Sequence, residues 1–224
     1  MLGDAIGDLL PSAVGVALSP IPIVAVILML GTPRARSTGP AFAAGWVLGL
    51  VAVSVIVLLV AGDSDSSDAT STGVDVAVLL FGLLLLAVAL RQWRGRPRAG
   101  EEPQMPKWMA AIDDFTAGRA FGLGVLLSGI NPKNLALTLA AAASLAQAGL
   151  SAGGDVVGVA VFVAIGSLTV AGPVLAYLVM GKGADRVLGE IKRFMSDHNA
   201  AIMTVVCLVL AAKLIGTAIG GLTD

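Results

Sequence analysis

Six apolar stretches follow one another along this chain of 224 residues, and each is long enough to cross a lipid bilayer as a helix. A membrane-spanning helix needs about 20 consecutive, mostly apolar residues. The sequence therefore predicts an all-α polytopic membrane protein with six transmembrane helices. The stretches cover residues 9–30, 38–61, 74–91, 120–147, 156–180 and 199–221.

The composition leaves little room for a soluble catalytic domain. Charged residues make up 13% of the chain and hydrophobic residues 57%, whereas soluble domains carry about 25% charged residues. A single Cys and a single His exclude an internal disulfide and most Cys/His metal clusters. We therefore expect no enzyme activity, no cofactor, no bound metal and no nucleic-acid partner.

Basic residues are distributed unevenly between the predicted loops. Apart from Lys133 and Lys213, all Lys and Arg lie in the first, third and fifth loops, while the termini and the other loops carry acidic residues. The positive-inside rule places the basic loops in the cytoplasm. We expect a bacterial plasma-membrane protein with both termini outside, its first apolar run retained because Met-Leu-Gly-Asp lacks the basic residues of a signal peptide.

The chain repeats a short motif at a constant offset. Gly15-Val-Ala-Leu-Ser and Gly124-Val-Leu-Leu-Ser share the pattern G-V-x-L-S. Each copy lies in the first span of a three-span half, and an odd number of spans inverts the second half. The sequence predicts two inverted three-helix repeats, 1–91 and 120–224, joined by a basic cytoplasmic loop over 92–119.

Both repeat copies carry helix-breaking residues, so helices 1 and 4 should be broken. Ser19-Pro20 and Asn131-Pro132 each pair an N-cap residue with a proline suited to the first helical position. Broken helices inside a membrane are tolerated where they are covered by protein or line a cavity. The positive ends of two restarted helices would attract an anion. The candidate substrate-binding residues are Ser19, Pro20, Pro22, Ser128, Asn131, Pro132, Lys133, Asn134 and Lys213.

Lys133 and Lys213 are the only charges in the interior of the predicted spans, since Asp75 and Arg91 lie at the two ends of the third span. Intramembrane charges are costly and mark functional sites by default. Their sign favours an anionic substrate group such as a phosphate, sulfate or carboxylate. The alternative is that each ammonium group caps backbone carbonyls and only holds helices together.

Two further patterns leave alternatives open. Segments 107–116 and 184–197 are amphipathic, and each either lies on the membrane surface or packs against the helix bundle. Glycine pairs with G-x-x-x-G spacing permit close helix contact, which favours packing within one protomer over a homodimer. These pairs are Gly45 and Gly49, Gly118 and Gly122, and Gly216 and Gly220.

Five short segments, spread over nearly the whole chain, have the sequence, order and spacing of a known family. They are Ala17-Leu-Ser-Pro-Ile-Pro-Ile, Gly45-Trp-Val-Leu-Gly, Arg91-Gln-Trp-Arg, Asn131-Pro-Lys-Asn and Lys213-Leu-Ile-Gly. Through them the chain resembles the lysine exporter (LysE) superfamily, and within it the peptidoglycolipid-addressing or sulfolipid-addressing proteins (GAP/Sap). The resemblance implies export, or help in export, of envelope lipids bearing sugar or acidic groups. It also implies that Asn131, Pro132 and Lys133 belong to the central site.

Three functions follow from these observations. The leading hypothesis is a transporter or flippase that exports an amphiphilic, anionic envelope lipid, and it expects a lateral opening with an apolar cavity. A small-solute exporter, for amino acids or similar metabolites, would instead have a closed polar cavity. A non-transporting adaptor would have collapsed breaks and would dock an export machine through its basic loops.

Overall fold

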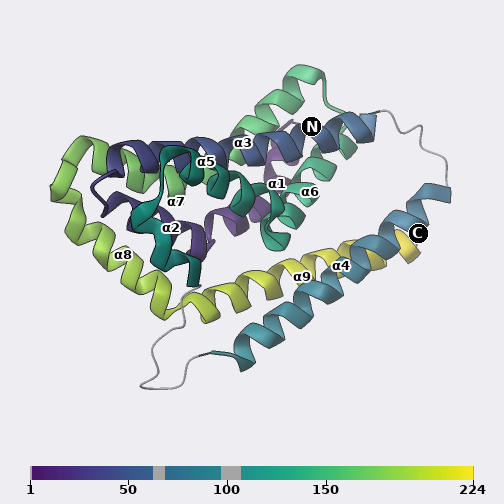
Figure 1. Ribbon diagram of the computed structural model, residues 1–224. Coiled ribbons are helices and arrows are strands. Elements are labelled where there is room, and N and C mark those ends of the chain that lie inside the picture. Colours follow the sequence, from purple (N-terminus) through teal and green to yellow (C-terminus); the bar gives the residue numbers. More distant parts are fainter. Residues whose placement is uncertain (1, 63–68, 97–106, 224) are drawn as a thin grey trace.

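The computed structural model describes residues 2–62, 69–96 and 107–223, and every regular element in those ranges is helical (Figure 1). This confirms the predicted all-α class. The acidic loop 63–68 and part of the basic loop, including Arg98, lie outside the described residues. The elements are α1 (Leu2–Ala17), α2 (Pro20–Leu30), α3 (Ala35–Gly62), α4 (Ala69–Arg94), η1 (Lys107–Asp114), α5 (Ala117–Val125), η2 (Leu126–Ile130), α6 (Pro132–Gln147), α7 (Ala152–Met180), η3 (Gly181–Ala184), α8 (Asp185–Asp197) and α9 (Asn199–Thr223).

Three helices of the described chain, α3, α7 and α9, are long and apolar enough to cross a membrane. The pair α1 and α2 makes a fourth candidate span when counted together, with a bend of 51° between its halves. The predicted fourth span is divided among α5, η2 and α6. The chain is thus a membrane protein with three to four span candidates, while the six-span count, the inverted repeat and the division into 1–91, 92–119 and 120–224 stay predictions.

Both interruptions arise from local sequence. After α1, Pro20 and Pro22 lack the N–H groups that would continue the hydrogen-bond ladder, and α2 restarts at Pro20 with extended backbone at Ser19. In the second half, η2 is a π-helical turn that ends at Asn131, whose ψ of 120° leaves the helical region. Pro132 then opens α6 at the first helical position, where its missing N–H is not needed.

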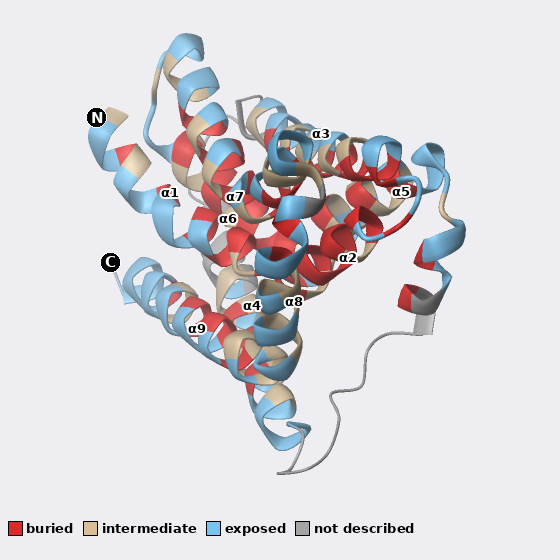
Figure 2. Cartoon of the chain, turned by 90° about the vertical axis from the view of Figure 1, so that its left-hand side faces the viewer, coloured by how far each residue is buried: buried red, intermediate tan, exposed pale blue. Residues whose placement is uncertain are grey.

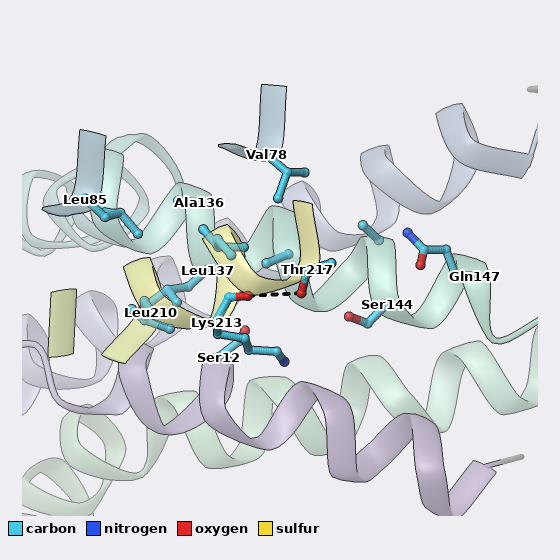
Figure 3. A pocket seen from close by; sticks show the side chains of 13 residues that line it. Ser12, Val78, Leu85, Ala136, Leu137, Ser144, Gln147, Leu210, Lys213 and Thr217 are labelled. Atoms are coloured by element: carbon cyan, nitrogen blue, oxygen red, sulfur yellow. Dashed lines mark hydrogen bonds between the residues drawn. The ribbon is translucent and has the colours of Figure 1, made fainter. Parts of the chain in front are cut away.

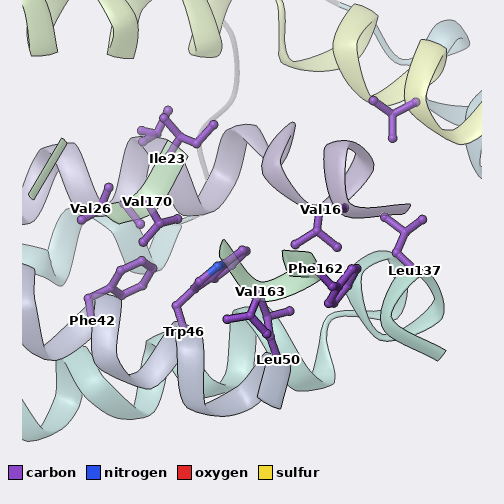
Figure 4. Close-up of a cluster of buried hydrophobic side chains, with 14 of the residues drawn as sticks. Val16, Ile23, Val26, Phe42, Trp46, Leu50, Leu137, Phe162, Val163 and Val170 are labelled. Carbon is purple, nitrogen blue, oxygen red and sulfur yellow. The ribbon is translucent and has the colours of Figure 1, made fainter. Parts of the chain in front are cut away.

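The core lies where α1, α2, α3 and α7 pack together. In Figure 4 the side chains of Phe42, Trp46 and Leu50 from α3 face Val16 of α1 and Phe162 of α7, and all five are fully buried. Figure 2 shows the buried residues gathered in this body, with α2 buried over most of its length. Polar side chains of both breaks, those of Ser19, Lys133 and Asn134, are buried, whereas Pro132 at the second break is exposed.

Close approach of α3 to α5 depends on glycine. A Cβ at Gly45 would meet the carbonyl oxygen of Phe121, and a Cβ at Gly124 would meet the carbonyl oxygen of Phe42. A Cβ at Gly49 would meet the side chain of Ser128. The pair Gly45 and Gly49 therefore packs helices within one protomer, as the sequence favoured. The other two pairs, Gly118 with Gly122 and Gly216 with Gly220, face open space in the described structure.

Helices α4 and α9 form a pair beside this body (Figure 1). A Cβ at Gly82 of α4 would lie 3.2 Å from the backbone nitrogen of Ile215 on α9, so the two helices approach closely there. The α4–α9 pair meets the body mainly through contacts of α9 with α1, α2 and α8. Figure 1 also shows the end of α9 at the right and α8 at the left, although the membrane side of each chain end stays a prediction.

The two amphipathic segments pack against α2. Met109 and Ile112 of η1 are buried in the core, as is Leu188 of α8. Packing against the bundle therefore explains these side chains. The outer surface of α8 still exposes Val187 and Phe194, so contact with a membrane surface stays a prediction for that face alone.

Candidate functional site

Lys133 connects the two helix breaks. Its side chain is 6% exposed, and its Nζ donates to the carbonyl oxygen of Leu18 at 3.1 Å and to Oγ of Ser19 at 2.8 Å. Leu18 follows the last residue of α1, where carbonyls lack helical partners. A cation at this negative end of the helix dipole is favourable, so the ammonium group of the second half satisfies the break in the first half.

Ser19 and Asn134 complete a buried polar chain. The hydroxyl of Ser19, which accepts from Lys133, donates to Oδ1 of Asn134 at 3.0 Å. Nδ2 of Asn134 then donates to the carbonyl oxygen of Leu127 at 2.8 Å. Ser19 and Asn134 are 4% and 0% exposed. Because a buried polar atom without a partner is costly, these bonds specify how the two halves meet.

The two capped carbonyls occupy equivalent positions in the predicted repeat. Leu18 and Leu127 each precede the serine of the shared G-V-x-L-S motif. Each carbonyl accepts from a side chain at the start of α6, Lys133 for Leu18 and Asn134 for Leu127. Two adjacent residues of α6, Lys133 and Asn134, thus donate hydrogen bonds to carbonyl groups at both helix breaks. The name break network is used below for Leu18, Ser19, Leu127, Lys133 and Asn134.

The start of α6 is capped locally, whereas the start of α2 is not. Oδ1 of Asn131 accepts from the backbone nitrogen of Lys133 at 3.1 Å, as an N-cap residue does. The side chain of Ser19 makes no such cap. Because Pro20 and Pro22 lack N–H groups, α2 offers only the N–H of Ile21 among its first three residues, and attraction of an anion falls mainly to Lys133.

The remaining predicted site residues separate into three groups. Pro20 and Pro22 are buried in the body, next to the break network. Ser128 is fully buried, and its hydroxyl donates to the carbonyl oxygen of Val125 at 3.3 Å, so it belongs to the α3–α5 packing. Asn131 is half-buried and Pro132 exposed.

Lys213 lies apart from the break network. Its exposed side chain donates from Nζ to the carbonyl oxygen of Asp8 at 2.8 Å. Asp8 precedes Leu18 by ten residues on α1, which corresponds to about 15 Å along a helix. The structure therefore brings together Ser19, Lys133 and Asn134, but not Lys213.

Sequence reasoning missed an apolar groove between α1 and α9. Its volume is about 520 Å³, and exposed apolar side chains, including Val14 at 46% and Val209 at 55%, leave it open to the side. One wall runs along α1 from Gly7 to Leu18, so the groove ends beside the carbonyl that Lys133 contacts. The lining residues are Gly7, Leu10, Pro11, Val14, Gly15, Leu18, Val205, Val206, Val209 and Leu210.

Thr169 of α7 is a second residue that the sequence did not single out. Its Oγ1 donates to the carbonyl oxygen of Ala17 at 2.6 Å, which satisfies a further carbonyl at the end of α1. A threonine within an apolar helix carries no signal of such a distant partner. Only the fold brings α7 to this break.

Replacement of Thr169 by valine should lower the free energy of unfolding by about 1 kcal/mol, because an intramolecular hydrogen bond is lost at constant side-chain volume. Thermal unfolding of the purified protein in detergent measures this effect. Thr223→Val is the matched control, since Thr223 is exposed and bonds only within its own helix. Equal melting temperatures for the two variants would contradict a role for Thr169 at the break.

The structure defines an all-helical membrane protein with two helix breaks joined by a buried lysine and an apolar groove beside them. The chain belongs to the Sap, sulfolipid-1-addressing protein, family, whose family model matches residues 9–220. No curated protein and no solved structure matches the chain. Family membership indicates a role in export or localisation of an envelope lipid or glycolipid. Placement in the wider lysine exporter superfamily stays a prediction.

Proposed function

We propose that this protein is a transporter of the bacterial plasma membrane that exports an amphiphilic, anionic envelope lipid or glycolipid. The observation that carries the proposal is the α1–α9 groove. It is apolar, it opens to the side, and it ends at Leu18, which belongs to the break network. An acyl chain fits the groove, while the headgroup would meet the polar break.

Lys133 retains capacity to bind a headgroup. A lysine ammonium group has three N–H donors, and two of them are directed to Leu18 and Ser19. The third can donate to a phosphate, sulfate or carboxylate oxygen. Charge-assisted bonds of this kind are stronger than neutral ones, and the interior of the predicted spans offers no carboxylate to compete for the lysine.

The groove also separates this proposal from a small-solute exporter. A site for an amino acid would be closed and mainly polar, whereas the exposed faces of Val14 and Val209 leave the groove open toward lipid. Membrane lipids are the partners that this surface fits. Association with envelope lipid export machinery is a further proposal, made on the family. Formation of a homodimer is another, made on the glycine pairs that face open space, Gly118 with Gly122 and Gly216 with Gly220.

The experiment compares lipids at the outer envelope of cells that carry the wild-type protein, no protein, or a groove variant. Val14→Trp should fill the groove, so the lipid class that is lost in the deletion should also fall at least several-fold in this variant. Val179→Trp is the matched control, because Val179 is 85% exposed on α7 and lies outside the groove. Membrane levels of each variant are measured by immunoblot.

Two results would count against lipid export. If deletion leaves every surface lipid class unchanged, the lipid function fails, and amino-acid efflux is assayed next. If deletion removes a lipid class but Val14→Trp and Val179→Trp both behave as wild type, the groove is not the lipid path. In that case the adaptor function, with docking through the basic loops, replaces transport.

A further inference from the structure

A second cavity lies between the α4–α9 pair and the body of the molecule, on the side of α6. Its volume is about 110 Å³, well above the ~10–15 Å³ that one water requires. Helices α1, α4, α6 and α9 all contribute lining residues. Lys213 lines this cavity and makes no contact with the break network, so its positive charge lies at a separate site.

The cavity is polar at one end and apolar at the other. In Figure 3 the side chains of Leu85, Leu137 and Leu210 lie at the left, and those of Ser144 and Gln147 lie at the right. Lys213 and Thr217 lie between these groups. An amphiphilic ligand would find apolar contact and hydrogen-bond partners within one cavity.

The polar end extends into a neighbouring pocket. Ser144 and Gln147 line both the cavity and a pocket of about 360 Å³ that Asp4 and Asp8 also line. A serine hydroxyl and a glutamine amide both donate and accept hydrogen bonds, and a carboxylate accepts them. This combination suits a headgroup with hydroxyl groups, beside an anionic group at Lys213.

Lys213 is accessible and only partly engaged. Its side chain is exposed, and its Nζ donates to the backbone carbonyl of Asp8, which leaves two of its three N–H donors for a ligand. The ion pairs found in the described residues do not include Lys213. The Lys213 ammonium group therefore faces the carbonyl oxygen of Asp8 and the cavity.

We propose that this cavity binds the headgroup region of an anionic, hydroxyl-bearing amphiphile, with Lys213 contacting the anionic group and Ser144 and Gln147 the hydroxyl groups. The inference rests on the proposed lipid export and adds a second binding site to it. Leu210 lines both this cavity and the α1–α9 groove. The two sites are thus neighbours on α9, and a lipid could pass from one to the other along that helix.

Binding is measured on the purified full-length protein in a neutral detergent, by microscale thermophoresis. The probe is lysophosphatidylglycerol, which has one acyl chain, a phosphate and two headgroup hydroxyls. Lysophosphatidylcholine with the same chain serves as the reference ligand without net charge or headgroup hydroxyls. Lys213→Gln should weaken lysophosphatidylglycerol binding about tenfold and leave lysophosphatidylcholine binding nearly unchanged. Lys192→Gln on α8 is the matched control and should behave as wild type.

A second variant tests the cavity itself. Ala143→Leu adds three carbons to a half-buried position in the cavity lining and should weaken binding of both lipids. Unchanged lysophosphatidylglycerol affinity in both Lys213→Gln and Ala143→Leu would overturn the proposal, and so would equal losses for the two lipids in Lys213→Gln. These binding results do not depend on the surface lipid content of cells. The proposed binding in the cavity can therefore be disproved while the proposed lipid export is supported, and lipid export can be disproved while binding in the cavity is supported.

Discussion

Replacement of Gly124 by alanine should destabilise the protein by about 3 kcal/mol or more, because overpacking of a rigid contact costs 1–3 kcal/mol and occasionally more. A Cβ at this position would overlap the carbonyl oxygen of Phe42 and lie 2.8 Å from the backbone nitrogen of Trp46. Neither atom can move away by a change of rotamer. Helices α3 and α5 would have to separate along the face that holds the second break.

The control lies on the same helix. Gly122 has nothing within 4 Å of an added Cβ, so Gly122→Ala should be neutral or slightly stabilising, as expected from helix propensity. Unfolding can be followed through Cys207, the single cysteine of the chain, which is fully buried. Its reaction with a thiol-specific dye during heating reports loss of the fold. Identical unfolding midpoints for Gly124→Ala and Gly122→Ala would show that α3 and α5 can accommodate an added Cβ at Gly124, which would contradict the close contact.

Replacement of Lys133 by methionine should lower the free energy of unfolding by about 3 kcal/mol. Hydrogen bonds to a charged group contribute about 1.5–3 kcal/mol, and the carbonyl of Leu18 would be left without the Lys133 donor. Methionine retains an unbranched side chain and leaves little empty volume. The same variant should lose surface lipid in the export assay, if the third N–H of Lys133 contacts the headgroup.

The same Cys207 dye assay separates these two effects. Lys213→Met is the matched control for stability, since exposed substitutions usually change stability by less than ~0.5 kcal/mol. If Lys133→Met retains the wild-type melting midpoint, the break network does not hold the halves together. If it melts early but exports lipid normally at equal membrane level, Lys133 is a structural residue alone and the headgroup contact is lost from the proposal.

The sequence predicted the positions of both helix breaks because proline acts locally. Ser19-Pro20 and Asn131-Pro132 interrupt their helices where expected. It also placed Lys133 directly after the second break. The partners of Lys133 were not predictable from one sequence, because Leu18 and Ser19 are more than a hundred residues away in the chain and no local pattern encodes that pairing.

Lys213 shows a different limit of prediction from sequence. Because Lys133 and Lys213 each interrupt an apolar stretch, the sequence predicts that both belong to one substrate-binding site. Depth along a span says nothing about the direction in which a side chain points, and Lys213 is directed toward Asp8 near the start of α1. The groove and the cavity were equally inaccessible to sequence reasoning, because both form between helices that are distant in the chain.

The α4–α9 pair has a consequence for biogenesis. Helix α4 packs chiefly against α9, and about a hundred residues separate the end of one from the start of the other. At a synthesis rate of 5–20 residues per second, the ribosome needs on the order of 5–20 s to deliver the partner. On the predicted six-span topology, α4 would lie in the bilayer during that interval, with its close-contact surface at Gly82 covered by lipid or by the insertion machinery. A chain that stops before residue 199 would leave α4 in this state, as a substrate for membrane quality control.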